Sequence, residues 1–146
     1  MRIGFIGTGT MGTPIAGCLV AAGHQLTVCD IRREATQTLQ QQGAAVADTP
    51  RAVAEGKEVV FTSLPGPKEV ETAALDPQSG LLAGLPEGGA YIDLTTNAPE
   101  TIRRIAAACR KRRQGGTRWH YHRAGVLSWP GPAQPSPRAL SNRTPR

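Results

Sequence analysis

The stretch IGFIGTGTMGTPIAGCLVAAGH (3–24) decides the fold of this chain. Its first residues form a short apolar run that ends at Gly7, which predicts a buried strand over residues 2–7. Gly7, Gly9 and Gly12 then have the G-x-G-x-x-G spacing, and apolar residues at helical spacing follow them. A strand that turns through glycines into a helix is typical of a phosphate cradle, because free backbone N–H groups and the positive end of the helix face the anion.

Each glycine has its own role in this prediction. Gly7 permits the tight turn out of the strand, Gly9 lets the backbone approach a pyrophosphate, and Gly12 lets the helix pack close to the sheet. In the alternative interpretation, the glycines only terminate a strand. The acidic residue that follows the next strand favours the cradle.

That acidic residue is Asp30, 18 residues after Gly12. Its carboxylate can accept hydrogen bonds from both hydroxyls of an adenine ribose, and it would repel a 2′-phosphate. The sequence therefore favours NAD as the cofactor over NADP. The neighbouring Arg32 and Arg33 keep NADP open, since either guanidinium can pair with a 2′-phosphate.

Strand and helix signals alternate through the first 113 residues. Further strands are predicted over residues 25–30, 44–46, 58–64 and 90–94. Helices are predicted over residues 11–23, 33–43, 49–56, 67–75 and 99–113. This alternation predicts an α/β fold with a Rossmann-like, doubly wound parallel sheet of about five strands, whose ligand binds at the carboxyl ends of the first and fourth strands.

Composition divides the chain into two parts. Residues 1–109 contain 8 Lys and Arg against 11 Asp and Glu, a net charge of −3, whereas residues 110–146 contain 9 Lys and Arg and no acid, a net charge of +9. We therefore predict an NAD(P)-binding domain over residues 1–112 and a basic tail rich in Pro and Arg over residues 113–146. The tail is expected to be mostly disordered, with one short strand at most over residues 124–129.

Several classes of protein are disfavoured. The sequence has no apolar run of 18 residues, which argues against a membrane span. Cys18, Cys29 and Cys109 lack the spacing of a metal site or a disulfide framework, so no metal is expected. No leader segment precedes the first strand, and we expect a cytoplasmic protein.

Three stretches resemble the 3-hydroxyacid dehydrogenase family, which includes 3-hydroxyisobutyrate dehydrogenase, tartronate semialdehyde reductase and the cofactor domain of 6-phosphogluconate dehydrogenase. GFIGTGTMGTPIAGCLVAAGH (4–24) is similar to the N-terminal signature of the family. VVFTSLPGPKEV (59–70) resembles its strand that ends in Leu-Pro, and YIDLTTNAP (91–99) resembles its Asp-x-Ser/Thr-Thr-x-x-Pro segment. The resemblance runs from Met1 to about Arg112.

The resemblance implies further cofactor contacts. Leu64 and Pro65 would line the ribose on the nicotinamide side, and Thr96 would lie near the nicotinamide and the substrate carboxylate. Without the resemblance, Leu64 and Pro65 simply end a strand, and Thr95 and Thr96 cap the helix ahead of Pro99. The predicted cofactor-binding residues are Gly7, Thr8, Gly9, Thr10, Met11, Gly12, Asp30, Leu64, Pro65 and Thr96.

The family continues with parts that this sequence does not match. After the fifth strand come a substrate-binding segment and a helical domain that supplies a catalytic lysine, whereas Lys57, Lys68 and Lys111 lie in no such context. We therefore predict no catalytic residue and a dinucleotide-binding domain with little activity of its own. The alternatives are an active oxidoreductase that borrows a catalytic domain from another chain, and a non-enzymatic binder whose basic tail contacts nucleic acid. Besides the dinucleotide cofactor, the candidate partners are a second copy of the chain, as a homo-oligomer, and a related full-length chain; nucleic acid is the less favoured partner.

Overall fold

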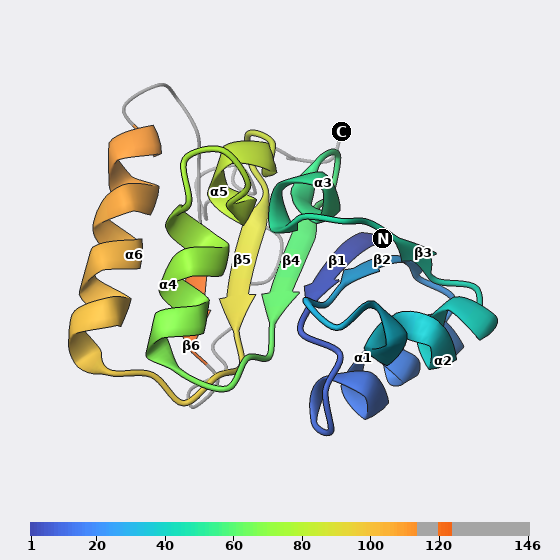
Figure 1. The fold of residues 1–146 in the computed structure, drawn as a ribbon. Coiled ribbons are helices and arrows are strands. Elements are labelled where there is room, and N and C mark those ends of the chain that lie inside the picture. Colours follow the sequence, from blue (N-terminus) through green and yellow to red (C-terminus); the bar gives the residue numbers. More distant parts are fainter. Residues whose placement is uncertain (114–119, 124–146) are drawn as a thin grey trace, which may run out of the picture.

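The computed structural model describes residues 1–113 and 120–123, in which strands and helices alternate (Figure 1). The strands are β1 (Arg2–Ile6), β2 (Gln25–Cys29), β3 (Ala45–Val46), β4 (Val59–Thr62), β5 (Ala90–Asp93) and β6 (His120–Arg123). The helices are α1 (Gly12–Ala21), the 3-10 turn η1 (Arg33–Thr36), α2 (Gln37–Gln41), α3 (Pro50–Ala54), α4 (Pro67–Leu75), α5 (Leu81–Gly84) and α6 (Pro99–Arg113).

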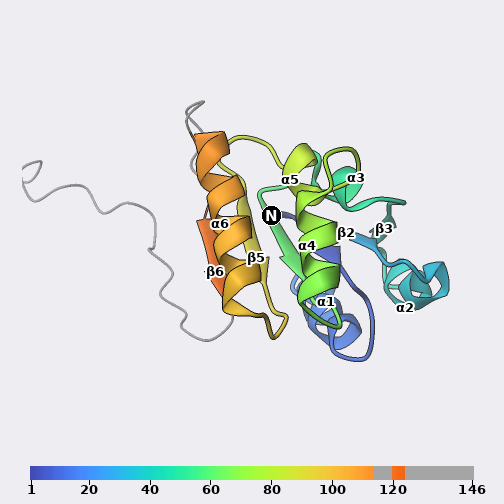
Figure 2. The ribbon, with the colours of Figure 1, turned by 60° about the vertical axis from the view of Figure 1, so that its left-hand side comes forward.

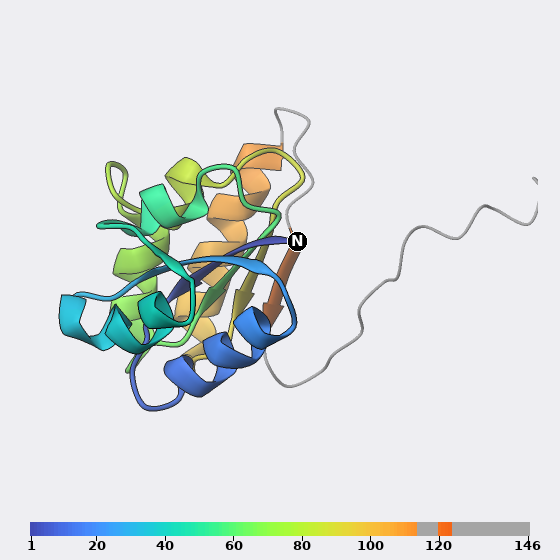
Figure 3. The ribbon, with the colours of Figure 1, turned by 90° about the vertical axis from the view of Figure 1, so that its right-hand side faces the viewer.

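The strands form one sheet in the order β3-β2-β1-β4-β5-β6, and all neighbours are parallel. This is the doubly wound order, in which the chain changes its direction of winding between β1 and β4. Figures 2 and 3 show α1 and α2 on one face of the sheet and α4 and α6 on the other. The predicted fold class is therefore confirmed.

Both faces of the sheet are covered by apolar side chains. One cluster joins Ile3 and Phe5 of β1 to Ala16 of α1 and Leu39 of α2. The other cluster contains residues of the strands and of all four helices on the opposite face: Ile6, Val53, Val60, Val70, Leu81, Tyr91 and Ile105. A parallel sheet needs this double cover, because its strands are apolar on both sides.

The structure differs from the sequence prediction in the region beyond α6. We expected about five strands and assigned residues 113–146 to an irregular tail, whereas β6 pairs in parallel register with the whole of β5. A further strand satisfies the backbone groups that the edge of β5 would otherwise leave unpaired. The short strand considered over residues 124–129 lies outside the described residues, and the domain boundary at residue 112 stays a prediction.

Two smaller differences concern helices. The helix predicted over residues 33–43 is divided into η1 and α2, and α5 was not predicted. The start of α3 follows the expected signals, since Thr49 Oγ1 accepts a hydrogen bond from the Ala52 N–H and Pro50 occupies the first helical position. In the described residues, no helix is both long and apolar enough to cross a membrane.

Candidate functional site at the carboxyl ends of the strands

The loop between β1 and α1 is a turn that only glycine permits at two positions. Gly7 has φ +92°, and a Cβ atom there would lie 2.2 Å from the Ser63 carbonyl oxygen. A Cβ atom on Gly12 would lie 1.9 Å from the Gly7 carbonyl oxygen and 3.2 Å from a ring carbon of Phe5. The tight turn and the close helix packing expected of Gly7 and Gly12 are therefore both present, and they hold α1 against the sheet.

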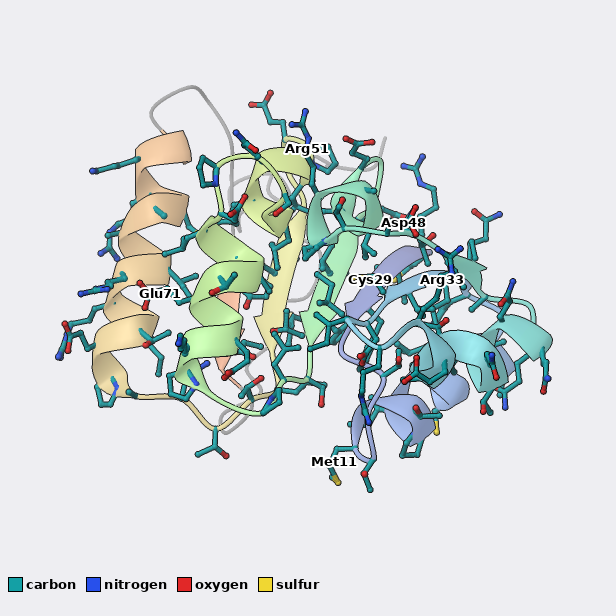
Figure 4. The ribbon with its side chains drawn as sticks, viewed as in Figure 1. Met11, Cys29, Arg33, Asp48, Arg51 and Glu71 are labelled. Atoms are coloured by element: carbon teal, nitrogen blue, oxygen red, sulfur yellow. The ribbon has the colours of Figure 1, made fainter. Side chains whose placement is uncertain are left out.

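Gly9 has a different environment. Apart from Gly9 itself and its two neighbours in the chain, no atom lies within 4 Å of the position that its Cβ atom would occupy, so the loop faces open space here. In the described part of the chain, no hydrogen bond uses the N–H groups of Gly9, Thr10 or Met11. Figure 4 shows Met11 extending away from the body of the protein at the tip of this loop. Three neighbouring amides of this loop thus have no partner in the described chain, and the loop is open at Gly9.

Asp30 follows β2 and is joined to the glycine loop. Its Oδ2 accepts a hydrogen bond of 2.8 Å from the backbone N–H of Thr8, and its Oδ1 accepts one of 2.9 Å from the N–H of Arg32. The Thr8 carbonyl oxygen in turn accepts a bond of 2.6 Å from the Thr13 hydroxyl, which ties the loop to α1. The sequence placed Thr8 and Asp30 in one site but gave no sign that they bond to each other. The contact fixes the carboxylate beside the loop.

The two arginines near Asp30 differ in their environment. Arg33 Nη1 lies 2.8 Å from Asp48 Oδ1, and both side chains are largely exposed (Figure 4). Arg32 is exposed, and its side chain makes no hydrogen bond or ion pair with the described residues. Asp48 is therefore a second acidic residue on this side of the site that the sequence analysis did not single out.

The thiol of Cys29, next to Asp30, is buried below this acidic region. Its pKa is raised to about 11, first by burial and then by the negative charges of Asp30 and Asp48. The thiol is therefore protonated at neutral pH and acts as a small apolar group of the core.

Two further loops reach the same edge of the sheet, one after β4 and one after β5. In Figure 1, β4 and β5 point towards the edge at which the β1–α1 loop lies and α4 and α6 begin. The N–H of Leu64 donates a 3.0 Å hydrogen bond to Oγ1 of Thr95, which joins the two loops. Leu64 is half-buried, whereas Pro65 and Thr96 are exposed beside it. The fold therefore brings all ten predicted residues to one edge of the sheet.

A buried polar network lies below these two loops. Asp93 is 1% exposed and accepts hydrogen bonds from the Thr62 hydroxyl, the Thr95 N–H and the Asn97 side-chain amide. The hydroxyl of Tyr91 lies 3.0 Å from that of Thr62. Sequence analysis did not identify Thr62, Tyr91 or Asn97, because nothing in the motif shows that β4 and β5 place them together.

A concave surface of the described residues lies away from this site. A groove of about 580 Å³ runs between α4 and α6, and it contains none of the predicted site residues. Within the described ranges, no group of three His, Cys, Asp or Glu side chains is placed to hold a metal ion.

Comparison with known proteins agrees with this architecture. The protein-family model that describes the NAD binding domain of 6-phosphogluconate dehydrogenase matches residues 2–117 of this chain. A protein of Arabidopsis thaliana named probable 3-hydroxyisobutyrate dehydrogenase-like 1, mitochondrial, is 46% identical over 107 residues, which are 73% of this chain and 32% of that protein.

Two solved structures are similar to the chain over most of its length. The structure named Psf3 in complex with NADP+ and 2-OPP is 35% identical with a TM-score of 0.72, covering 82% of this chain and 40% of that one. Mycobacterium tuberculosis 3-hydroxyisobutyrate dehydrogenase, solved with L-serine, is 26% identical with a TM-score of 0.70, covering 83% and 38%. The chain spans about a third of the length of the curated relatives it matches. It belongs to the family defined by the NAD binding domain of 6-phosphogluconate dehydrogenase, together with 3-hydroxyisobutyrate dehydrogenase-like proteins.

Proposed function

We propose that this chain binds NAD at the carboxyl edge of its sheet, as the cofactor domain of a 3-hydroxyisobutyrate dehydrogenase-like oxidoreductase. The observation that carries the proposal is a glycine loop that is open at Gly9, has three successive amides without partners in the described chain, and is bonded through Thr8 to the Asp30 carboxylate. When bound, the nicotinamide ring supplies a site that accepts or donates a hydride. The chain itself supplies the contacts that hold and orient the cofactor.

The glycine loop would hold the pyrophosphate. The N–H groups of Gly9, Thr10 and Met11 are free to donate to phosphate oxygens, and the amino end of α1 adds its positive partial charge. A side chain at position 9 would occupy the space that the phosphates need. Gly7 and Gly12 act indirectly in this proposal, because they allow the turn and the packing of α1.

Asp30 would hold the adenine ribose. A carboxylate has about four acceptor positions, and the N–H groups of Thr8 and Arg32 use two of them. The Thr8 hydroxyl donates a longer bond of 3.4 Å to Oδ2, so Oδ1, which has a single partner, keeps capacity for a ribose hydroxyl. The backbone contacts also hold the carboxylate in place before the cofactor arrives, which lowers the entropy cost of binding.

The same region favours NAD over NADP in this proposal. A 2′-phosphate would meet the carboxylate of Asp30 and the nearby charge of Asp48, and Asp48 already pairs with Arg33. Among the described residues near Asp30, Arg32 has no ion pair and is available to a 2′-phosphate. NADP, with which the Psf3 structure was solved, is therefore the competing cofactor to test.

Leu64, Pro65 and Thr96 would line the nicotinamide half. Leu64 and Pro65 follow β4, the strand next to β1 at the switch point, and Thr96 follows β5. Ligands of doubly wound sheets bind beyond the carboxyl ends of these strands. The Thr96 side chain is exposed and makes no hydrogen bond with the described residues, so its hydroxyl can donate to a cofactor or substrate oxygen.

Hydride transfer also needs a group that moves the proton of the substrate hydroxyl. By resemblance to the family, a lysine of the helical domain does this, and none of the three lysines here has that context. We infer that the chain by itself binds the cofactor with little turnover, since loss of a positioned acid or base costs about 10²–10⁴-fold in rate. Turnover then requires a catalytic domain that a related full-length chain supplies.

Calorimetric titration of the full chain with NAD, NADP and ADP tests the cofactor assignment. We expect binding of all three ligands, with NAD tighter than NADP. Absence of NAD and ADP binding by a folded chain would refute the function, and tighter binding of NADP would refute the assigned cofactor. Addition of a full-length relative to the NAD-bound chain, followed by NADH absorbance with a 3-hydroxyacid, tests the need for a partner.

A further inference from the structure

We propose that Asp93 is a positioning residue for the nicotinamide half of the cofactor. Its buried carboxylate holds the loop after β4 and the loop after β5 in the relative arrangement that the nicotinamide half requires. The inference rests on the proposed function, because Leu64, Pro65 and Thr96 belong to these two loops. Asp93 itself touches no ligand in this proposal.

The hydrogen bonds of Asp93 reach the end of β4 and the loop after β5. Oδ1 accepts from the Thr62 hydroxyl at 2.7 Å, at the end of β4, and from the Thr95 N–H at 3.0 Å, just beyond β5. Oδ2 accepts from the side-chain amide of Asn97, two residues further along the same loop. One carboxylate therefore fixes the last residue of β4 and two positions of the turn that carries Thr96.

The link continues from Thr95 to Leu64. Because Asp93 holds the Thr95 backbone, the Thr95 hydroxyl is placed where the Leu64 N–H donates to it at 3.0 Å. The peptide chain leads directly from Leu64 to the exposed Pro65. Loss of Asp93 would remove the hydrogen bond that holds the Thr95 backbone. Loss of the Thr95 hydroxyl would keep that bond and remove the next one, between Thr95 and the Leu64 N–H.

A carboxylate suits this position because it only accepts hydrogen bonds. Its Oδ1 takes the Thr62 hydroxyl hydrogen, so the hydrogen bond between the Thr62 and Tyr91 hydroxyls has Tyr91 as its donor. The hydrogen bonds of this network therefore run in one order: the Tyr91 hydroxyl donates to Thr62, and the Thr62 hydroxyl donates to Asp93. A network with a single hydrogen-bond direction has fewer competing arrangements, which keeps the loops in one conformation.

Asn97 makes a conservative replacement informative. Its Oδ1 is buried and has no hydrogen-bond partner among the described residues. In Asp93→Asn, the new side-chain amide can point its NH2 group at Asn97, and Asn97 can rotate its own amide to accept with Oδ1. We therefore expect Asp93→Asn to retain most of the positioning that Asp93→Ala loses.

The test compares NAD with ADP, which lacks the nicotinamide half, on the full chain. We expect Asp93→Ala and Thr95→Val each to lower the affinity for NAD about fivefold or more, which corresponds to the loss of one hydrogen bond. The affinity for ADP should stay within about twofold of wild type. Asp93→Asn should bring NAD affinity back towards wild type. Asp76→Ala is the matched control, since Asp76 also accepts three hydrogen bonds, from Gln78 and Ser79, at the far end of α4. It should change neither affinity.

Equal weakening of NAD and ADP by Thr95→Val would overturn the inference, because it would indicate general loosening of the fold. Unchanged NAD affinity in a folded Thr95→Val chain would overturn it too. Thr95→Val decides the matter if Asp93→Ala does not fold, since it leaves the carboxylate in place. A wild-type chain that binds ADP as tightly as NAD would refute the positioning role and keep the cofactor site, whereas binding of neither ligand would refute the proposed function itself.

Discussion

Replacement of Gly9 by leucine separates cofactor binding from folding. Gly9 is outside the left-handed region, and its Cβ atom would meet nothing within 4 Å, so the folded chain accepts a side chain there. We expect Gly9→Leu to keep the wild-type melting temperature within about 2 °C, because an exposed substitution that causes no clash changes stability by about 0.5 kcal/mol or less.

The same substitution should abolish most NAD binding. A leucine side chain would occupy the space beside the amides of Gly9, Thr10 and Met11. If it displaces the pyrophosphate from two of these amides, the loss is about 1.5 kcal/mol for each charge-assisted hydrogen bond. The sum of about 3 kcal/mol corresponds to a more than hundredfold rise in the Kd for NAD. Gly9→Ala should produce a smaller rise in the same direction.

Calorimetry measures the Kd, and thermal melting confirms folding. Gly17→Ala is the control: it adds a Cβ atom in α1 that meets only Gln42 Oε1, at 3.4 Å, and it should leave NAD affinity unchanged. Gly12→Ala gives the opposite contrast, because its Cβ atom would clash with the Gly7 carbonyl oxygen, and it should lower the melting temperature. A folded Gly9→Leu chain that binds NAD within twofold of wild type would refute the assignment of the loop to the pyrophosphate.

Three other predictions concern the acidic side of the site. Asp30→Ala should weaken NAD about tenfold in calorimetry, because the ribose loses a charged acceptor and the Thr8 amide loses its partner, and unchanged affinity would contradict this role. Asp48→Asn should raise the affinity for NADP by up to about fivefold and leave the affinity for NAD unchanged, since it releases Arg33 from an exposed ion pair. This gain in NADP affinity should shrink at high salt. The pKa of Cys29 is raised to about 11, so above pH 9 the folded state binds more protons than the unfolded state. The free energy of unfolding, measured by urea denaturation, should therefore fall between about pH 9 and pH 11. Cys29→Ala should flatten this part of the plot of unfolding free energy against pH.

The glycine loop was predictable from the sequence because its constraints are local. The contact between Gly12 and the Gly7 carbonyl oxygen joins residues five positions apart, and the turn at Gly7 follows directly from its φ of +92°. A spacing motif records such constraints directly. The strand order could also be predicted from the sequence, since alternating strands and helices of this length allow few parallel arrangements.

The contacts between distant segments were not predictable. The bond between Thr8 and Asp30 spans 22 positions, and that between Leu64 and Thr95 spans 31. Their partners have no periodic pattern and meet only because β1, β2, β4 and β5 end at the same edge. Strand β6 was missed for a related reason: HYHR has neither an apolar run nor a clear alternation, and its pairing is set by the open edge of β5.

The distribution of satisfied and free polar groups around the site is itself informative. Thr8, Asp30, Leu64 and Asp93 all have hydrogen-bond partners that hold the three loops against the sheet, whereas the amides at Gly9, Thr10 and Met11 have none in the described chain. A loop that is fixed by its neighbours loses little entropy when an anion binds to its free amides. On the proposed function, cofactor affinity is therefore a property of these residues, while the rate of hydride transfer depends on groups that they do not include. Removal of a partner chain should then lower turnover and leave the Kd for NAD unchanged, and a large rise in that Kd would show that the partner completes the cofactor site.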